Sequence, residues 1–172
     1  ACGIAGRGLF HAPIAIFLEK SILCIEAMYA VCYSGNYYTV LDTAMPASRI
    51  EKILESLKPA AIITDKKSVD SISADTEVLL MEELLEEAAD DALLKSIRDN
   101  MQSTDLMYVL FTSGSTGVPK GVTTSHLAYI QYLEGAGEVY ELEENDRFLS
   151  QVPFYFVMAG TDIYAPAMCG CT

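Results

Sequence analysis

The sequence predicts an α/β fold in which a layered parallel sheet carries helices on both faces. Two observations lead to this fold class. Within the first 65 residues, short apolar segments rich in β-branched residues alternate with longer segments whose apolar residues recur at helical spacing. The apolar segments are also continuous, which is typical of strands that are buried on both faces of a parallel sheet. Right-handed crossovers are expected between them.

The first half of the chain supplies most of this pattern. Ser21 is a good helix N-cap, the Ser-Gly-Asn run at 34–36 is a turn, and Pro59 ends a second helix. The expected elements are a strand at 11–18, a helix at 21–33, a strand at 37–41, a helix from 46 with Ile50 and Ile53 on its apolar face, and a strand at 60–64.

The second half is less regular. The expected elements are a strand at 78–80, one acidic helix over 82–100, a buried strand from 105 or 106 to 111, an extended segment at 122–124, a helix from 125 or 126 to 138, a strand at 147–152 and a helix at 159–168. The acidic helix is amphipathic, which indicates a solvated outer face, and we assign it no chemistry.

Composition and charge bound the function. The 172 residues are 51% hydrophobic, enough for one domain with a core. The sequence has 11 Lys and Arg residues and 24 Asp and Glu residues, which gives a net charge of −13. A nucleic-acid partner or an anionic membrane surface requires a basic face, so neither fits. No apolar run reaches the roughly 18 residues of a membrane span.

The five cysteines do not suggest a disulfide framework or a metal site. Their number is odd, none forms a Cys-x-x-Cys pair, and no histidine lies near them in sequence. Cys24 and Cys32 fall in an apolar helical pattern and are expected to be buried reduced thiols. A reducing cytoplasm is therefore the expected location, and we expect no protein-bound metal cluster.

The most informative segment is Thr112–Gly121, whose sequence is TSGSTGVPKG. Four hydroxyl residues, three glycines and one lysine fall within these ten residues. Glycines let backbone N–H groups approach an anion, hydroxyls add donors, and Lys120 adds a positive charge. Lys120 is also the only formally charged side chain between Leu106 and Leu133. The segment is therefore suited to a triphosphate tail, in spite of the acidic chain around it.

Two common phosphate motifs do not fit this segment. A P-loop requires Gly-x-x-x-x-Gly-Lys-[Ser/Thr], whereas Gly121 follows Lys120 here, and the dinucleotide motif Gly-x-Gly-x-x-Gly is absent. The alternative interpretation is an ordinary Gly/Ser-rich hairpin loop.

The whole pattern resembles the phosphate-binding motif of the AMP-forming adenylation superfamily, which includes acyl-CoA synthetases, non-ribosomal peptide synthetase adenylation domains and D-alanine–carrier-protein ligases. Three further segments occur in the order found in that family. SGNYYTVLD, at 34–42, is similar to Ala-Gly-x-x-Tyr-Val-Pro-Leu-Asp. Met45–Ile50 resembles Tyr-Pro-x-x-Arg-Leu, and Pro153–Phe156 resembles Pro-Phe-x-Phe.

The resemblance implies ATP-dependent activation of a carboxylic or amino acid as an acyl-adenylate, followed by thioester formation on coenzyme A or on a carrier protein's phosphopantetheine. It also implies that the β- and γ-phosphates are bound by Thr112, Ser113, Gly114, Ser115, Thr116, Gly117 and Lys120. ATP and Mg²⁺ are the implied cofactors, with the magnesium ligands largely outside this chain. No catalytic residue is assigned within it.

The same resemblance places Phe156, Val157 and Met158 at the substrate pocket. In relatives that activate amino acids, an aspartate stands where this chain has Val157 and pairs with the substrate ammonium. A valine cannot do so, which favours an acyl or aryl acid. Asp162 could take the aspartate's part only if the register were shifted. His126, just after the loop, could contact the loop or simply cap and pack a helix.

The extent of the resemblance indicates an excised fragment. Residues 1–172 correspond to part of the large N-terminal domain of an adenylate-forming ligase, and the C-terminal domain has no counterpart here. We therefore expect the fragment alone to be inactive. The alternative function is an isolated α/β binding module without catalytic activity.

Overall fold

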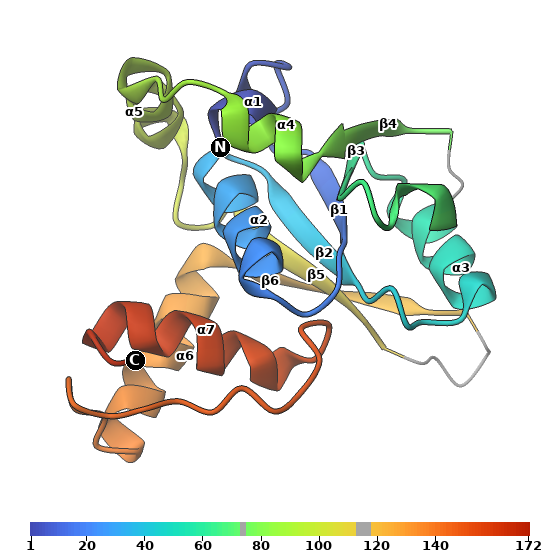
Figure 1. Cartoon of the computed structure of the whole chain (residues 1–172). Helices are drawn as coiled ribbons and strands as arrows, with labels where there is room; N and C mark the ends of the chain where they lie inside the picture. Colours follow the sequence, from blue (N-terminus) through green and yellow to red (C-terminus); the bar gives the residue numbers. More distant parts are fainter. Residues whose placement is uncertain (73–74, 113–117) are drawn as a thin grey trace.

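The structure is a computed structural model that describes residues 1–72, 75–112 and 118–172 (Figure 1). Its strands are β1 (Pro13–Phe17), β2 (Tyr37–Leu41), β3 (Ala61–Thr64), β4 (Glu77–Leu80), β5 (Leu106–Thr112) and β6 (Lys120–Ser125). Its α-helices are α1 (Cys2–Ala5), α2 (Ile22–Tyr33), α3 (Ala47–Leu57), α4 (Met81–Glu86), α5 (Asp91–Asn100), α6 (His126–Val139) and α7 (Val157–Cys169), with a 3₁₀ turn at Val69–Ser71.

The six strands form one sheet in the order β4-β3-β1-β2-β5-β6. All neighbours are parallel except β5 and β6, which form an antiparallel pair. The predicted fold class is confirmed, with β6 as an antiparallel edge strand that the continuous apolar pattern did not indicate.

The order of the strands explains why helices cover both faces. From β1 the chain moves to β2 on one side and then back across β1 to β3 on the other side. Right-handed crossovers in opposite directions put their helices on opposite faces. Accordingly, α2 and α3 lie on opposite sides of the sheet (Figure 1).

Two hydrophobic clusters fill the two sides. The larger one contains Ile14 and Ile16 of β1 and receives α2, α6 and α7. The smaller one contains Ala15 and Phe17 of the same strand and receives Ile53 of α3. Successive β1 side chains thus serve opposite faces, as the period of two requires.

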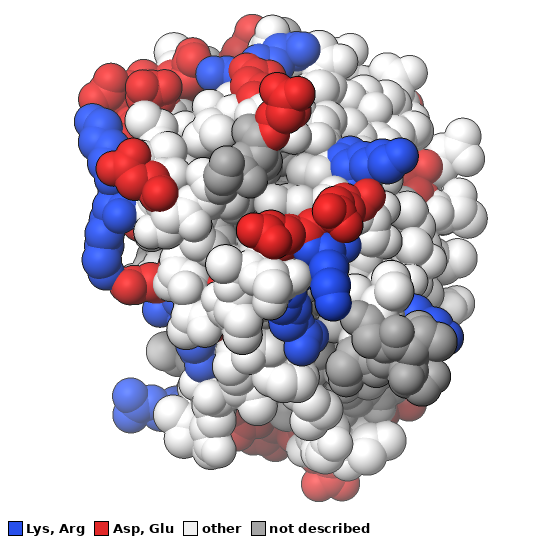
Figure 2. Space-filling model, turned by 90° about the vertical axis from the view of Figure 1, so that its right-hand side faces the viewer, with Lys and Arg blue, Asp and Glu red and all other residues white. Residues whose placement is uncertain are grey.

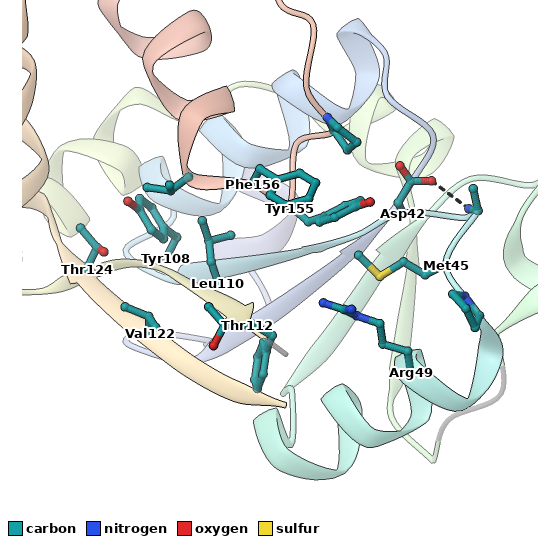
Figure 3. A pocket seen from close by; sticks show the side chains of 15 residues that line it. Asp42, Met45, Arg49, Tyr108, Leu110, Thr112, Val122, Thr124, Tyr155 and Phe156 are labelled. Atoms are coloured by element: carbon teal, nitrogen blue, oxygen red, sulfur yellow. Dashed lines mark hydrogen bonds between the residues drawn. The ribbon is translucent and has the colours of Figure 1, made fainter. Parts of the chain in front are cut away.

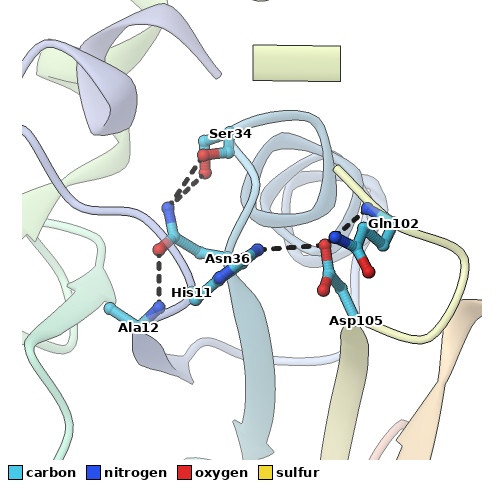
Figure 4. Close-up of polar contacts among 6 residues, drawn as sticks. All are labelled: His11, Ala12, Ser34, Asn36, Gln102 and Asp105. Carbon is cyan, nitrogen blue, oxygen red and sulfur yellow. Dashed lines mark hydrogen bonds and ion pairs between the residues drawn. The ribbon is translucent and has the colours of Figure 1, made fainter. Parts of the chain in front are cut away.

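Buried polar groups fix the start of β1 against the turn that ends α2. The Asn36 side chain accepts a hydrogen bond from the Ala12 N–H at 2.9 Å and donates to Ser34 O at 3.0 Å (Figure 4). It also donates to Leu9 O at 3.0 Å. Nearby, His11 Nε2 lies 2.9 Å from the Asp105 carboxylate, which also accepts from the Gln102 N–H. These contacts hold β1, β2 and β5 at their amino ends.

Three sequence expectations are wrong in detail. The acidic helix 82–100 is two helices, because Asp90 caps α5 by accepting from the Leu93 N–H at 2.9 Å, although the exposed α5 confirms a solvated outer face. Residues 147–152 form no strand, since Phe148 and Val152 pack against the core without a sheet partner. The helical spacing of Ile22, Ile25, Tyr29 and Cys32 predicts one apolar face for α2. Instead, Cys24 and Met28 are buried, while Ile22 at the helix start is exposed.

Candidate functional site

A cavity of about 770 Å³ lies at the carboxyl ends of β2 and β5 (Figure 3). Four segments surround it: the turn after β2 and the first turn of α3, the second half of β5, the middle of β6, and the segment that enters α7. Carboxyl ends of parallel strands are where α/β proteins usually bind ligands. The fold therefore places the cavity where a site is expected.

The pairing of β2 with β5 explains why space is left there. Their register consists of one pair, Tyr38 opposite Tyr108, and Thr39 Oγ1 donates to Val109 O at 2.7 Å beyond it. Further along, Asp42 follows β2 and Thr112 ends β5, and both line the cavity. The cavity thus occupies the region in which these two strands no longer pair.

The ends of the predicted phosphate loop are held together by β5 and β6. Thr112 and Lys120 face each other in the antiparallel register, and Thr112 Oγ1 donates to Lys120 O at 3.4 Å. Thr112 lines the cavity, whereas Lys120 is exposed and does not. The predicted phosphate-binding residues Ser113, Gly114, Ser115, Thr116 and Gly117 lie outside the described residues.

Close packing between β5 and β6 explains why position 121, the last of the loop sequence, is a glycine. A Cβ added there would lie 2.8 Å from Val109 Cγ1 and 3.3 Å from the Phe111 ring on the neighbouring strand. A carbon–carbon contact is normally 3.5–4.0 Å. The glycine is therefore required for β6 to approach β5 next to the loop.

The predicted substrate-pocket residues separate. Phe156 and Val157, both more than half exposed, line the same cavity as Thr112. Met158 turns away and lines a different hollow, together with Asp162 one helical turn further along α7. The cavity thus brings together residues of two predicted segments that lie about 40 residues apart in sequence. Thr112 comes from the phosphate-loop segment, and Phe156 and Val157 come from the acyl-pocket segment.

Lys20 positions the segment that enters α7. Its Nζ donates to Ser150 O at 2.7 Å and Val152 O at 2.9 Å, and it lies 5.2 Å from the centre of the Phe154 ring. A charged donor satisfies two carbonyls that no strand satisfies. The position of Phe156 therefore depends on a residue 136 positions earlier.

Two charged residues of the cavity were not singled out from the sequence. Asp42 accepts a hydrogen bond from the Ala44 N–H at 2.8 Å and is the one carboxylate among the described lining residues. Arg49, in the first turn of α3, extends into the cavity (Figure 3). Both residues belong to segments that carry the family resemblance. Their position after a parallel strand is the sequence feature that could have indicated a place in the site.

The rest of the lining is apolar and hydroxylic. Leu110, Val122 and Phe156 supply apolar surface, while Tyr108 and Thr124 supply hydroxyls. Burial raises the pKa of the Tyr108 phenol, so it stays a neutral donor at physiological pH. An apolar cavity with a few polar groups is typical of a small-molecule site.

Other predicted residues have structural roles or lie elsewhere. Ser125, and not His126, caps α6 by accepting from the Ala128 N–H, and His126 lines a separate cavity. Cys24 is buried and Cys32 is half-buried, and burial raises the pKa of each thiol to about 12. The predicted burial is thus confirmed for Cys24, and both thiols stay protonated near neutral pH.

No group of three or more metal-ligating side chains occurs among the described residues. In the same part of the chain, no helix combines the length and apolar character needed to cross a bilayer. On the face shown in Figure 2, Lys and Arg side chains are interspersed with Asp and Glu.

Comparisons with known proteins identify related proteins. A family model described as AMP-binding enzyme matches residues 1–172. The PKS-NRPS hybrid synthetase acdB of Aspergillus candidus is 36% identical over 162 residues, which cover 92% of this chain and 6% of that protein. The D-alanine–D-alanyl carrier protein ligase of Lactococcus lactis subsp. lactis is 30% identical over 171 residues, covering 96% of this chain and 34% of the ligase.

Solved structures share the fold. A crystal structure of the nonribosomal peptide synthetase FmoA3 (S1046A) superposes with a TM-score of 0.85 at 25% identity, covering 99% of this chain and 18% of that one. This chain spans about a third of the single ligase and a few per cent of the synthetases. Because the family model matches every residue of it, the chain belongs to the AMP-binding enzyme family.

Proposed function

We propose that the complete protein is an AMP-forming ligase that activates a carboxylic or amino acid with ATP and transfers the acyl group to a thiol. The observation that carries the proposal is the shared cavity, where Thr112 from the loop segment meets Phe156 and Val157 from the acyl-pocket segment. An acyl-adenylate needs both its phosphate and its acyl part in one site. The family to which the chain belongs supports this chemistry.

In this proposal the loop holds the polyphosphate tail of ATP. Thr112, Ser113, Gly114, Ser115, Thr116 and Gly117 donate hydrogen bonds to the β- and γ-phosphates, and Lys120 adds its charge from the start of β6. These groups orient the tail and stabilise the charge that moves onto pyrophosphate, while the substrate carboxylate is the nucleophile.

Magnesium would share the phosphate charge. Asp42 is the single carboxylate among the described cavity residues, and its oxygen already accepts from Ala44 N–H. One such carboxylate does not make a magnesium site, so we assign no magnesium ligand to this chain.

We further propose that residues 1–172 are part of the large N-terminal domain, and that the protein works in the cytoplasm, which its five free thiols favour.

Two observations bear on the chemical class of the acid substrate, and they favour different classes. Val157 lines the cavity with an apolar side chain, which favours an acyl or aryl acid. The printed names of relatives include a D-alanine–D-alanyl carrier protein ligase and an L-proline–[L-prolyl-carrier protein] ligase, which favour an amino acid. Those names also favour a carrier protein's phosphopantetheine over coenzyme A as the acceptor.

ATP–pyrophosphate exchange by the complete protein tests the proposal. A screen of acyl, aryl and amino acids should yield exchange with one class and no exchange without acid. We expect the 172-residue chain alone to be inactive. Absence of exchange with every acid, together with ATP binding by the chain, would favour the alternative of a binding module without catalysis.

A further inference from the structure

Arg49 carries a guanidinium group that nothing in the described structure neutralises. It extends from the first turn of α3 into the 770 Å³ cavity (Figure 3). Its Nε is buried and has no hydrogen-bond partner among the described residues. No carboxylate of the described chain lies within ion-pair distance of it, although Asp42 lines the same cavity.

Arg49 as a whole is half-buried, and its buried Nε lacks a hydrogen bond that a bound anion could supply. Burying a charged group without a partner costs free energy, because the group gives up its hydration. An arginine cannot relieve that cost by losing its proton. The guanidinium instead presents several N–H donors in a fixed fork, which matches the oxygens of a phosphate or carboxylate.

The surroundings favour a phosphate over the acid substrate. Figure 3 shows the Arg49 side chain reaching toward the end of β5, where Thr112 leads into the predicted phosphate loop. Phe156, just before α7, enters the cavity from another side (Figure 3), and Val157 at the start of α7 also lines it. The cavity thus has a polar side, with Arg49 and Thr112, and an apolar side suited to an acyl group.

We propose that Arg49 binds a phosphate group in this cavity, beside Thr112. This inference rests on the proposed function, because that function brings phosphate to the site. It adds a residue from α3, some 60 positions before the loop. Two sources share the chemistry: the polyphosphate tail of ATP and the phosphodiester of a phosphopantetheine arm.

Three variants of the complete protein test the proposal. Arg49→Ala removes the charge, Arg49→Lys keeps the charge without the fork, and Lys58→Ala is the matched control. Lys58 is exposed at the opposite end of the same helix and lines no part of this cavity. Binding of inorganic pyrophosphate is measured by calorimetry, the KM for ATP by pyrophosphate exchange, and the KM for the carrier protein by acyl loading.

We expect Arg49→Ala to weaken pyrophosphate binding and raise the KM for ATP at least about tenfold, the effect of losing a charge-assisted hydrogen bond. Arg49→Lys should lie between wild type and Arg49→Ala, and Lys58→Ala should match wild type. A rise confined to the carrier-protein KM would instead identify phosphopantetheine as the source. Because the Arg49 side chain makes no described hydrogen bond, the melting temperature of Arg49→Ala should be no lower than that of wild type.

Unchanged pyrophosphate binding, ATP KM and carrier KM in Arg49→Ala would overturn the inference while leaving the proposed function intact. The opposite failure is also distinguishable. If the wild-type protein showed no exchange with any acid, the proposed function would be wrong, and calorimetry with pyrophosphate would still decide whether Arg49 binds phosphate.

Discussion

Replacing Gly121 by alanine tests the packing that closes the loop. The new Cβ would lie 2.8 Å from Val109 Cγ1, well inside the normal contact distance. Val109 is buried, so it can respond only by leaving its preferred χ1 rotamer or by moving β5 away from β6. A rotamer shift costs about 0.5–1.5 kcal/mol and overpacking about 1–3 kcal/mol.

Part of this loss is offset. Alanine reduces the conformational freedom of the unfolded chain, which stabilises the protein by about 0.4–1 kcal/mol where the backbone suits it. We therefore expect Gly121→Ala to lower the free energy of unfolding by about 1 kcal/mol. Urea unfolding of the chain measures this, and because the chain has ten tyrosines and no tryptophan, tyrosine fluorescence is the probe.

A double-mutant cycle separates this clash from other causes. Val109→Ala alone loses about 0.8 kcal/mol for each buried methylene-sized group that is removed. It also removes the atom against which the new Cβ would press. The double variant should therefore be about as stable as Val109→Ala alone. If the two losses simply added, or if Gly121→Ala were as stable as wild type, the argument from close approach would be refuted.

Three further predictions concern other parts of the fold. In urea unfolding, Gly35→Ala should lower the free energy of unfolding clearly more than Gly8→Ala. Both glycines have φ near +70°, but a Cβ at position 35 would lie 2.4 Å from the Phe10 ring, whereas no atom lies within 4 Å of a Cβ at position 8. Equal losses of stability would contradict this reasoning. Burial lowers the pKa of His126 below 6.5, so the unfolded state binds a proton on this residue more readily than the folded state does. The free energy of unfolding should therefore fall as pH drops from 6.5 through the folded-state pKa. His126→Phe should reduce this pH dependence, and an unchanged dependence would count against burial of His126 as its cause. Lys20→Met should raise the acid KM in pyrophosphate exchange several-fold with little change in the ATP KM, because it releases the carbonyls of Ser150 and Val152 before Phe156; an equal rise in both would point to general unfolding.

The local pattern of the sequence was enough for most elements of the first half. Ser21 caps α2 by accepting from the Cys24 N–H, and β2 spans the predicted residues 37–41. These elements depend on neighbouring residues, namely a cap, a turn and a β-branched run, so the sequence carries the necessary information. The loop motif was equally visible, because its residue types carry the chemistry.

Contacts between distant segments were beyond the reach of local pattern. Residues 147–152 are predicted as a strand, but the carbonyls of Ser150 and Val152 accept from Lys20, and no strand of the described chain pairs with them. Likewise, the antiparallel direction of β6 follows from its pairing with β5, which no single segment encodes.

The sequence by itself determined the α/β class, the phosphate-loop motif and the family resemblance, since each of these depends on residue types over a few adjacent positions. Only the tertiary structure decided that Thr112, Phe156 and Arg49 share one cavity while Met158 leaves it. The physical reason is that the single register pair between β2 and β5, and the Lys20 bonds to the segment before α7, set the walls of that space.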